Sequence, residues 1–185
     1  MEWGILFMGS VGSGKTEAIR SLSDIEVLNT DVGATDETLL LKNNTTVSMD
    51  VGVLHLDSND KLRLYGAPGQ DRFDFMWDIL VQQSKGLILL INHANPDPLA
   101  DFQHYITALS NILTHRKVPL AIGITHVDET DNPSLQPYLD YLAKNPIPFV
   151  TGTPPICRID ARVKQDVKIL MIAIAGMLEV HERLG

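Results

Sequence analysis

The stretch that most constrains this chain is residues 9–16, which read GSVGSGKT. It fits the pattern G-x-x-x-x-G-K-T and directly follows residues 3–8, an apolar run typical of a buried strand. Glycines allow the backbone to turn sharply between a strand and a helix, so that successive N–H groups point at one anion near the helix N-terminus. The pattern therefore predicts a phosphate-binding loop. The alternative is a Gly/Ser-rich turn that fits the pattern by chance.

The residues of such a loop have separate tasks. Lys15 is expected to bridge the β- and γ-phosphates of a nucleotide, and the Thr16 hydroxyl to bind the Mg²⁺ that neutralises the same oxygens. We predict that phosphate is bound by Gly9, Ser10, Val11, Gly12, Ser13, Gly14, Lys15 and Thr16.

Length and composition favour one globular unit. We expect a single domain over all 185 residues, and the 44% hydrophobic and 21% charged residues are ordinary for a soluble protein. The formal net charge of -8 argues against a nucleic-acid partner, because phosphate backbones require clustered Lys and Arg. Because neither end carries a secretion or lipid-attachment signal, we expect a cytoplasmic location and no direct membrane anchor.

Strand-like and helix-like segments alternate along most of the chain. This alternation predicts an α/β fold of the P-loop NTPase class, with helices on both faces of a doubly wound, mostly parallel six-stranded sheet. Residues 46–56 and 61–65 are expected to pair as a hairpin that gives the sheet one antiparallel edge strand. Residues 29–44, rich in Thr, Asp and Asn, are expected to form mostly a mobile connection. The predicted strands are residues 3–8, 46–56, 61–65, 86–92, 118–124 and 155–159, and the predicted helices are residues 16–22, 73–83, 99–114, 133–142 and 163–182.

Ligands of such sheets bind outside the carboxyl ends of the strands, so the residues just after each strand are candidates. After residues 61–65 the chain reads GAPGQ, in which the Gly69 N–H is expected to meet the γ-phosphate and Gln70 to orient an attacking water. The candidate catalytic residues are Gln70, Lys15 and Gly69.

Asp128 ends the sequence THVD, which follows another predicted strand. Guanine presents its N1–H and 2-amino groups side by side, and one ionised carboxylate accepts both hydrogen bonds, whereas adenine has no such pair of donors. Asp128 therefore favours GTP over ATP. The alternative is an aspartate that only forms a turn in a polar loop.

The order of these motifs resembles the Ras-like small GTPases, and within them the bacterial MglA-like branch. The resemblance covers essentially the whole chain and rests on GSVGSGKT, on Thr46, on YGAPGQDRF at 65–73, on THVD and on DAR at 160–162. It implies that Thr46 and Thr16 bind Mg²⁺ and that a second switch runs from Gly66 to Trp77. It also implies a roadblock-domain regulator as a partner. The implied guanine-binding residues are Thr125, His126, Asp128, Ala161 and Arg162.

Two positions depart from that pattern. Gly66 stands where the family usually has an aspartate that helps to hold Mg²⁺, so we expect looser Mg²⁺ binding unless Asp50 or another carboxylate substitutes. His126 stands where the family usually has lysine, and an imidazole carries less charge at neutral pH. Both changes predict a lower nucleotide affinity than in typical relatives.

Hydrolysis is expected to be slow. No arginine lies between Arg20 and Arg63 to serve as an arginine finger, and small GTPases without one turn over at roughly 10⁻⁴ per second. We therefore expect a GTP-binding switch for signalling, with GTP or GDP as ligand, Mg²⁺ as cofactor and hydrolysis stimulated by a partner. Two alternatives remain: a nucleotide-binding scaffold without useful hydrolysis, and a P-loop ATPase or kinase.

Phe73, Phe75 and Trp77 form an aromatic group within the predicted second switch. They are candidates for part of a partner surface. The simpler interpretation, which we favour for Phe73 and Trp77, is that they pack their helix on the sheet.

Overall fold

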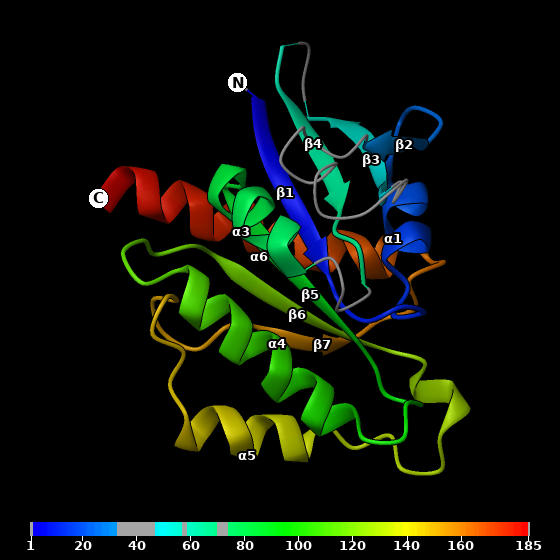
Figure 1. Cartoon of the computed structure of the whole chain (residues 1–185), viewed down its shortest axis with the longest axis vertical. Coiled ribbons are helices and arrows are strands. Elements are labelled where there is room, and N and C mark those ends of the chain that lie inside the picture. The colour runs from blue at the N-terminus through cyan, green and yellow to red at the C-terminus, as the bar shows by residue number, and fades with distance from the viewer. Residues whose placement is uncertain (1, 33–46, 57–58, 70–73, 185) are drawn as a thin grey trace.

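The computed structural model describes residues 2–32, 47–56, 59–69 and 74–184. These residues form an α/β fold in which a mixed seven-stranded sheet lies between two layers of helices (Figure 1). The strands are β1 (Glu2–Met8), β2 (Leu28–Val32), β3 (Val47–His55), β4 (Lys61–Gly66), β5 (Gly86–Asn92), β6 (Leu120–Thr125) and β7 (Ile156–Arg158). The helices are α1 (Lys15–Leu22), α3 (Asp74–Gln83), α4 (Pro98–Ile112), the short 3₁₀ helix η2 (Val127–Glu129), α5 (Gln136–Lys144) and α6 (Lys164–Leu184).

The strands lie in the order β2-β3-β4-β1-β5-β6-β7. Strands β4, β1, β5, β6 and β7 run parallel to one another, whereas β3 is antiparallel to both β2 and β4. The predicted hairpin of residues 46–56 and 61–65 is thus present as β3 and β4. The prediction of six strands with the antiparallel one at the edge was wrong, because β2 lies outside β3 and forms that edge.

Strand β2 overlaps the start of residues 29–44, which were expected to form mostly a mobile connection. Its sequence, LNTDV, has apolar residues only at its two ends and so lacks the apolar run of a buried strand. It pairs with β3 in register from Leu28 opposite Val51 to Val32 opposite Val47. An edge strand is held largely by main-chain hydrogen bonds to one neighbour, and for that reason polar residues are tolerated there.

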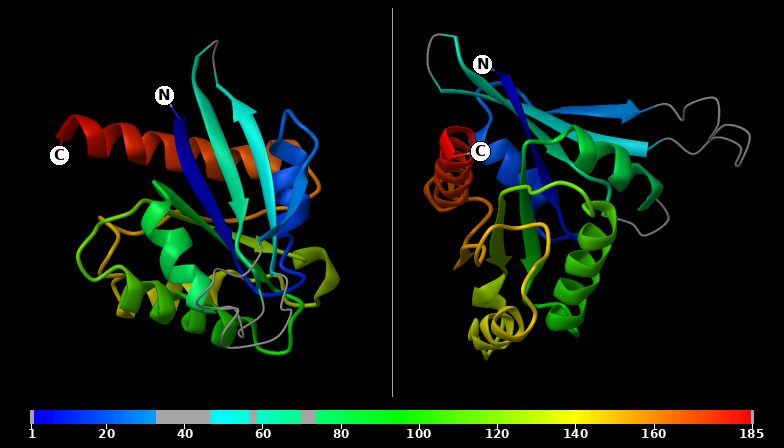
Figure 2. Two further views of the ribbon diagram at one scale, coloured as in Figure 1. Left: turned by 45° about the horizontal axis from the view of Figure 1, so that its top comes forward. Right: turned by 90° about the vertical axis from the view of Figure 1, so that its left-hand side faces the viewer.

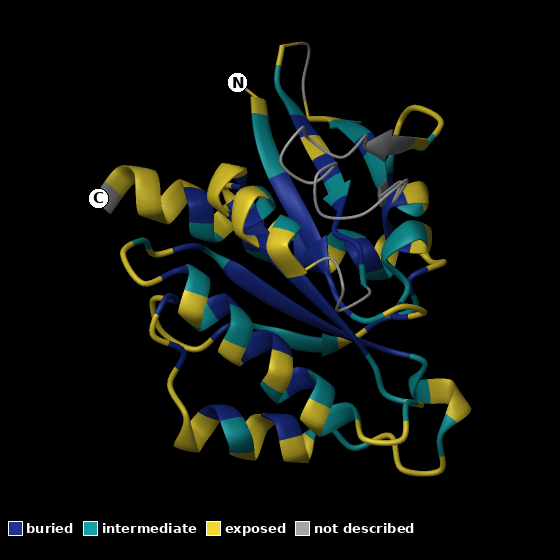
Figure 3. Ribbon diagram, in the orientation of Figure 1, coloured by how far each residue is buried: buried dark blue, intermediate teal, exposed yellow. Residues whose placement is uncertain are grey.

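The helices cover both faces of the sheet, as expected. In the right-hand view of Figure 2, α6 lies on one side of the sheet, and α3 and α4 lie on the other. Successive residues of β1 alternate between the two cores: Ile5 and Phe7 pack with residues of α1 and α6, and Leu6 and Met8 pack with residues of α3, α4 and α5. All four side chains are at most 1% exposed, and burial of each contributes about 1.5–3 kcal/mol. Figure 3 shows the same burial along the central strands.

Several predicted boundaries shift by a few residues. Helix α4 begins at Pro98, one residue before the predicted start, because the Asp97 side chain accepts a hydrogen bond from the Ala100 N–H and caps the helix. Helix α5 begins at Gln136 and not at residue 133, and β7 is shorter than the predicted strand of residues 155–159.

Helix α6 has 21 residues and packs along the sheet through one stripe of apolar side chains. Val167, Leu170, Ile174 and Leu178 in this stripe are buried, at the spacing of three or four residues that places side chains on one face of a helix. Across the described ranges of the chain, none of the helices combines the length and the apolar character needed to cross a membrane.

Candidate functional site

The GSVGSGKT loop follows β1, which ends at Met8, and its last two residues, Lys15 and Thr16, begin α1. Three of its glycines, Gly9, Gly12 and Gly14, have positive φ values of 149°, 78° and 101°, which other residues rarely adopt. Gly9 is also constrained by space, since a Cβ there would lie 2.3 Å from the main-chain oxygen of Leu90. The sequence therefore folds as predicted at this point, into a tight turn that leads to a helix N-terminus.

Lys15 is folded back over this loop. Its Nζ donates hydrogen bonds to the carbonyl oxygens of Gly9 (2.6 Å) and Ser10 (2.8 Å). Burial lowers the pKa of Lys15 to about 8, and the negative charge of Asp50 opposes part of this decrease. A phosphate bound beside this ammonium group would favour its charged form and so raise the pKa of Lys15 again.

Three polar side chains from neighbouring strand ends brace the loop from outside. Asn92, at the end of β5, donates from Nδ2 to the Gly12 carbonyl (3.2 Å), and Asn95 donates to the Ser10 hydroxyl (3.4 Å). The buried hydroxyl of Thr125, at the end of β6, donates to the Ser13 carbonyl (2.8 Å). The two asparagines were not among the predicted site residues, although their position at the end of a predicted strand (Asn92) and just after it (Asn95) was the available signal.

Gly69 lies against the loop. A Cβ on this residue would be 2.7 Å from the Val11 nitrogen and 2.8 Å from Lys15 Nζ, so only glycine fits this conformation. The predicted catalytic residues Gly69 and Lys15 are thus close together. Gln70 and Thr46, the other predicted catalytic and metal-binding residues, lie outside the described part of the chain.

Helix α3 holds the segment that presents Gly69. Trp77 is 1% exposed, stacks on Tyr105 with ring centroids 5.1 Å apart, and donates from Nε1 to the Pro68 carbonyl (3.0 Å). The packing interpretation is therefore correct for Trp77. Phe75 is 52% exposed, and Phe73 is not described.

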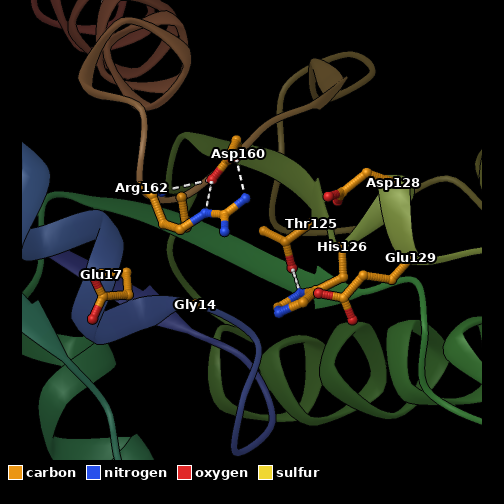
Figure 4. A pocket seen from close by; sticks show the side chains of 9 residues that line it. Gly14, Glu17, Thr125, His126, Asp128, Glu129, Asp160 and Arg162 are labelled. Atoms are coloured by element: carbon orange, nitrogen blue, oxygen red, sulfur yellow. Dashed lines mark hydrogen bonds and ion pairs between the residues drawn. The ribbon is translucent and has the colours of Figure 1, made fainter.

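A pocket of about 110 Å³ opens beside the loop, at the carboxyl ends of β6 and β7 (Figure 4). This volume is smaller than that of typical small-molecule sites, so the pocket by itself takes only part of such a ligand. His126, with a φ of 56°, turns the chain after β6 into η2, which carries Asp128. The lining residues are Gly14, Glu17, Thr125, His126, Asp128, Glu129, Asp160, Ala161 and Arg162, which include all five residues predicted to bind guanine.

The loop after β7 is held by an ion pair. Arg162 donates from Nε (2.9 Å) and Nη2 (2.7 Å) to the two carboxylate oxygens of Asp160, as Figure 4 shows. These hydrogen bonds lower the pKa of the Asp160 carboxyl to about 2 and raise the pKa of Arg162. The Arg162 guanidinium is therefore engaged with Asp160, while its neighbour Ala161 faces the loop: a Cβ on Gly14 would lie 2.9 Å from the Ala161 Cβ.

Oxygen atoms that suit a metal ion lie at the start of α1. The Thr16 hydroxyl donates a hydrogen bond to the carboxylate of Asp50, which belongs to β3. No cluster of three or more His, Cys, Asp or Glu side chains that could hold a metal ion occurs among the residues with described positions.

A glycine-rich loop between the first strand and first helix of such a sheet is compatible with a P-loop NTPase. The chain belongs to the family described as "Conserved hypothetical ATP binding protein", whose family model matches residues 26–179. The matched region includes seven of the nine residues that line the pocket and begins after the GSVGSGKT loop. No curated protein matches the chain.

This family assignment corrects one prediction. The resemblance to the MglA-like branch of the Ras-like small GTPases was wrong, because the matching family is a different one. The motifs that carried the resemblance are short sequences at strand ends, and a fold of this class serves many families, so these motifs do not single out one branch. The roadblock-domain partner was implied by that resemblance alone and stays an untested prediction.

Proposed function

We propose that the protein binds a purine nucleoside triphosphate and hydrolyses it slowly, with GTP preferred over ATP. The observation that carries this proposal is the position of Gly14. It belongs to the glycine-rich loop and also lines the pocket that contains Asp128. One nucleotide can therefore reach both, with its phosphates on the loop and its base in the pocket.

The geometry around Lys15 supports phosphate binding. The ammonium group is fixed by two carbonyl oxygens of the loop, and α1 begins at this residue. The partial positive charge of the helix N-terminus and the lysine act on the same anion.

Asp128 supports the choice of guanine. Its carboxylate lies at the exposed rim of the pocket on a turn fixed by His126, and it would accept hydrogen bonds from both N1–H and the 2-amino group. A second candidate, an ATPase, is favoured by the family description, which names ATP.

For hydrolysis, a water molecule attacks the γ-phosphorus and the bond to the β–γ bridging oxygen breaks, which releases a diphosphate and inorganic phosphate. Lys15 and the Gly69 N–H would stabilise the charge on the γ-phosphate oxygens, and Gln70 would orient the water. Release of the γ-phosphate would free the segment around Gly69 from the loop, so that the surface offered to a signalling partner changes.

A direct binding titration with GDP and ADP tests the choice of base. We expect GDP to bind more tightly by about 10- to 100-fold, since hydrogen bonds to a charged group contribute about 1.5–3 kcal/mol. The Asp128→Ala variant should lose this preference, whereas Glu129→Gln, which changes a neighbouring carboxylate of the same pocket, should keep it. Equal or tighter binding of ADP to the wild type would reject GTP in favour of ATP. Absence of binding to either nucleotide would reject the function itself.

A further inference from the structure

Asp50 is a charged residue within β3, a strand otherwise rich in valine. Register pairing places it opposite Gly66, the last residue of β4. Directly paired residues of an antiparallel ladder project their side chains to the same face of the sheet. Gly66 has no side chain, and the Asp50 carboxylate uses the space above it: a Cβ on Gly66 would lie 3.4 Å from the Asp50 Cβ and 3.6 Å from its Oδ2.

The close approach of α1 brings this carboxylate to the phosphate loop. A Cβ on Gly52 would lie 2.8 Å from Ile19 Cγ2, and a Cβ on Gly66 would lie 3.1 Å from Ile19 Cδ1. The two glycines thus let β3 and β4 pack directly on α1. As a result Asp50 reaches the first turn of the helix, where it accepts the hydrogen bond from the Thr16 hydroxyl.

In P-loop NTPases, Mg²⁺ is held by the hydroxyl residue of the loop and by an aspartate on a neighbouring strand. Strand β4 ends at Gly66 and offers no such group. We propose that Asp50, from β3, supplies the carboxylate of the Mg²⁺ site in its place. This inference rests on the proposed binding of a nucleoside triphosphate.

The donor set fits this ion. Mg²⁺ takes oxygen ligands, keeps several waters, and is usually bound through one or two carboxylates together with substrate phosphates. Thr16 and Asp50 provide two oxygen donors, too few to hold the ion without the phosphates, so the metal enters together with the nucleotide. When bound, it neutralises the repulsion between the Asp50 carboxylate and the phosphate oxygens.

This charge balance gives a test that separates a metal ligand from a structural residue. In excess Mg²⁺, Asp50→Asn should weaken binding of a non-hydrolysable triphosphate by about 10- to 100-fold. In EDTA the same variant should bind as tightly as the wild type or more tightly, because a negative charge has been removed next to the phosphates. Binding is measured with fluorescent GTP and ATP analogues, using the base that the wild type prefers. Asp140→Asn, at an exposed position of α5, is the matched control and should behave as wild type under both conditions.

The Mn²⁺ affinity of the nucleotide complex, followed by electron paramagnetic resonance, gives a second readout and should fall by a similar factor in Asp50→Asn. Unchanged Mg²⁺ dependence in this variant would overturn the proposal, as would equal weakening in Mg²⁺ and in EDTA, which marks a structural role. If the wild type binds no nucleotide in either condition, the proposed function fails and this inference falls with it.

A second variant keeps the test valid if Asp50→Asn disturbs the fold. Thr16→Val removes the other proposed ligand and leaves the side-chain shape almost unchanged. Because both residues would bind one ion, T16V/D50N should lose little more Mg²⁺ dependence than either single variant. Fully additive losses in the double variant would contradict a shared metal ion.

Discussion

In the proposed function, the Asp128 carboxylate decides between guanine and adenine. Its position on the turn after β6 comes from His126, whose left-handed backbone conformation starts η2. The substitution Asp128→Asn replaces one carboxylate oxygen with an NH₂ group and would leave this turn intact. Its effect on the choice of base can therefore be measured separately from any effect on the fold.

We predict that Asp128→Asn changes the preferred base from guanine to xanthine. The asparagine oxygen would accept from N1–H and its NH₂ group would donate to the 2-oxo group, which replaces the 2-amino donor of guanine. In a titration, the ratio of XDP affinity to GDP affinity should rise by at least about tenfold relative to the wild type, which is the contribution of one good hydrogen bond. A variant that still prefers GDP would show that Asp128 does not contact the base.

The Asp160–Arg162 pair makes a prediction about pH. Folding lowers the Asp160 pKa from 3.8 to about 2 through the Arg162 hydrogen bonds, so the pair stabilises the fold above the unfolded value of 3.8. This contribution is lost as the pH falls from 3.8 toward 2. Arg162→Gln should therefore be less stable than the wild type near neutral pH, by a small amount because the pair is well exposed. Urea denaturation across this range checks the result, and a difference that grows on acidification would contradict it.

Helix α3 links the core to the site, because buried Trp77 holds the Pro68 carbonyl. We predict that Trp77→Phe lowers the free energy of unfolding by about 1–3 kcal/mol, through the lost hydrogen bond and the smaller ring. Phe75→Ala, at a half-exposed position on the same helix, should change it by less than about 0.5 kcal/mol. Chemical denaturation of both variants gives the comparison. Equal losses would show that Trp77 has no special role in anchoring the segment.

Elements with a continuous apolar run could be predicted from the sequence, and elements held mainly by their neighbours could not. Strands β1, β5 and β6 are buried on both faces, so their composition alone identifies them. Strand β2 is an edge strand with polar residues, and nothing in its periodicity distinguishes it from a loop.

The same distinction holds within the site. The glycine-rich loop follows from its own spacing, since both the turn and the helix start are local. The roles of Asn92 and Asn95 depend on strand order, and the meeting of Asp50 with Thr16 depends on the register of β3 against β4. Spacing along the chain marks these residues as candidates and does not determine which residues they contact.

The order of the strands places β1 in the middle of the sheet, between β4 and β5. The loops that follow β1, β4, β5 and β6 therefore surround the start of α1. Both cores pack against this central strand, so a ligand bound at its carboxyl end is coupled to the stability of the entire domain.

We predict that saturating nucleotide raises the melting temperature. At a concentration 100-fold above its dissociation constant, a ligand stabilises the native state by about 2.7 kcal/mol, which corresponds to roughly 5–10 °C for a domain of this size. Lys15→Ala should abolish most of this shift. A thermal melt of both proteins with and without GDP and Mg²⁺ provides the measurement, and an equal shift in the variant would place the ligand elsewhere.

The proposal that one nucleotide is held at both ends can be tested by NMR titration of the isotope-labelled protein with GDP. We expect the amide signals of residues 9–16 and those of residues 125–128 and 160–162 to shift together, with one common dissociation constant. Shifts confined to one of these two groups, or two different dissociation constants, would contradict a single nucleotide spanning the loop and the Asp128 pocket.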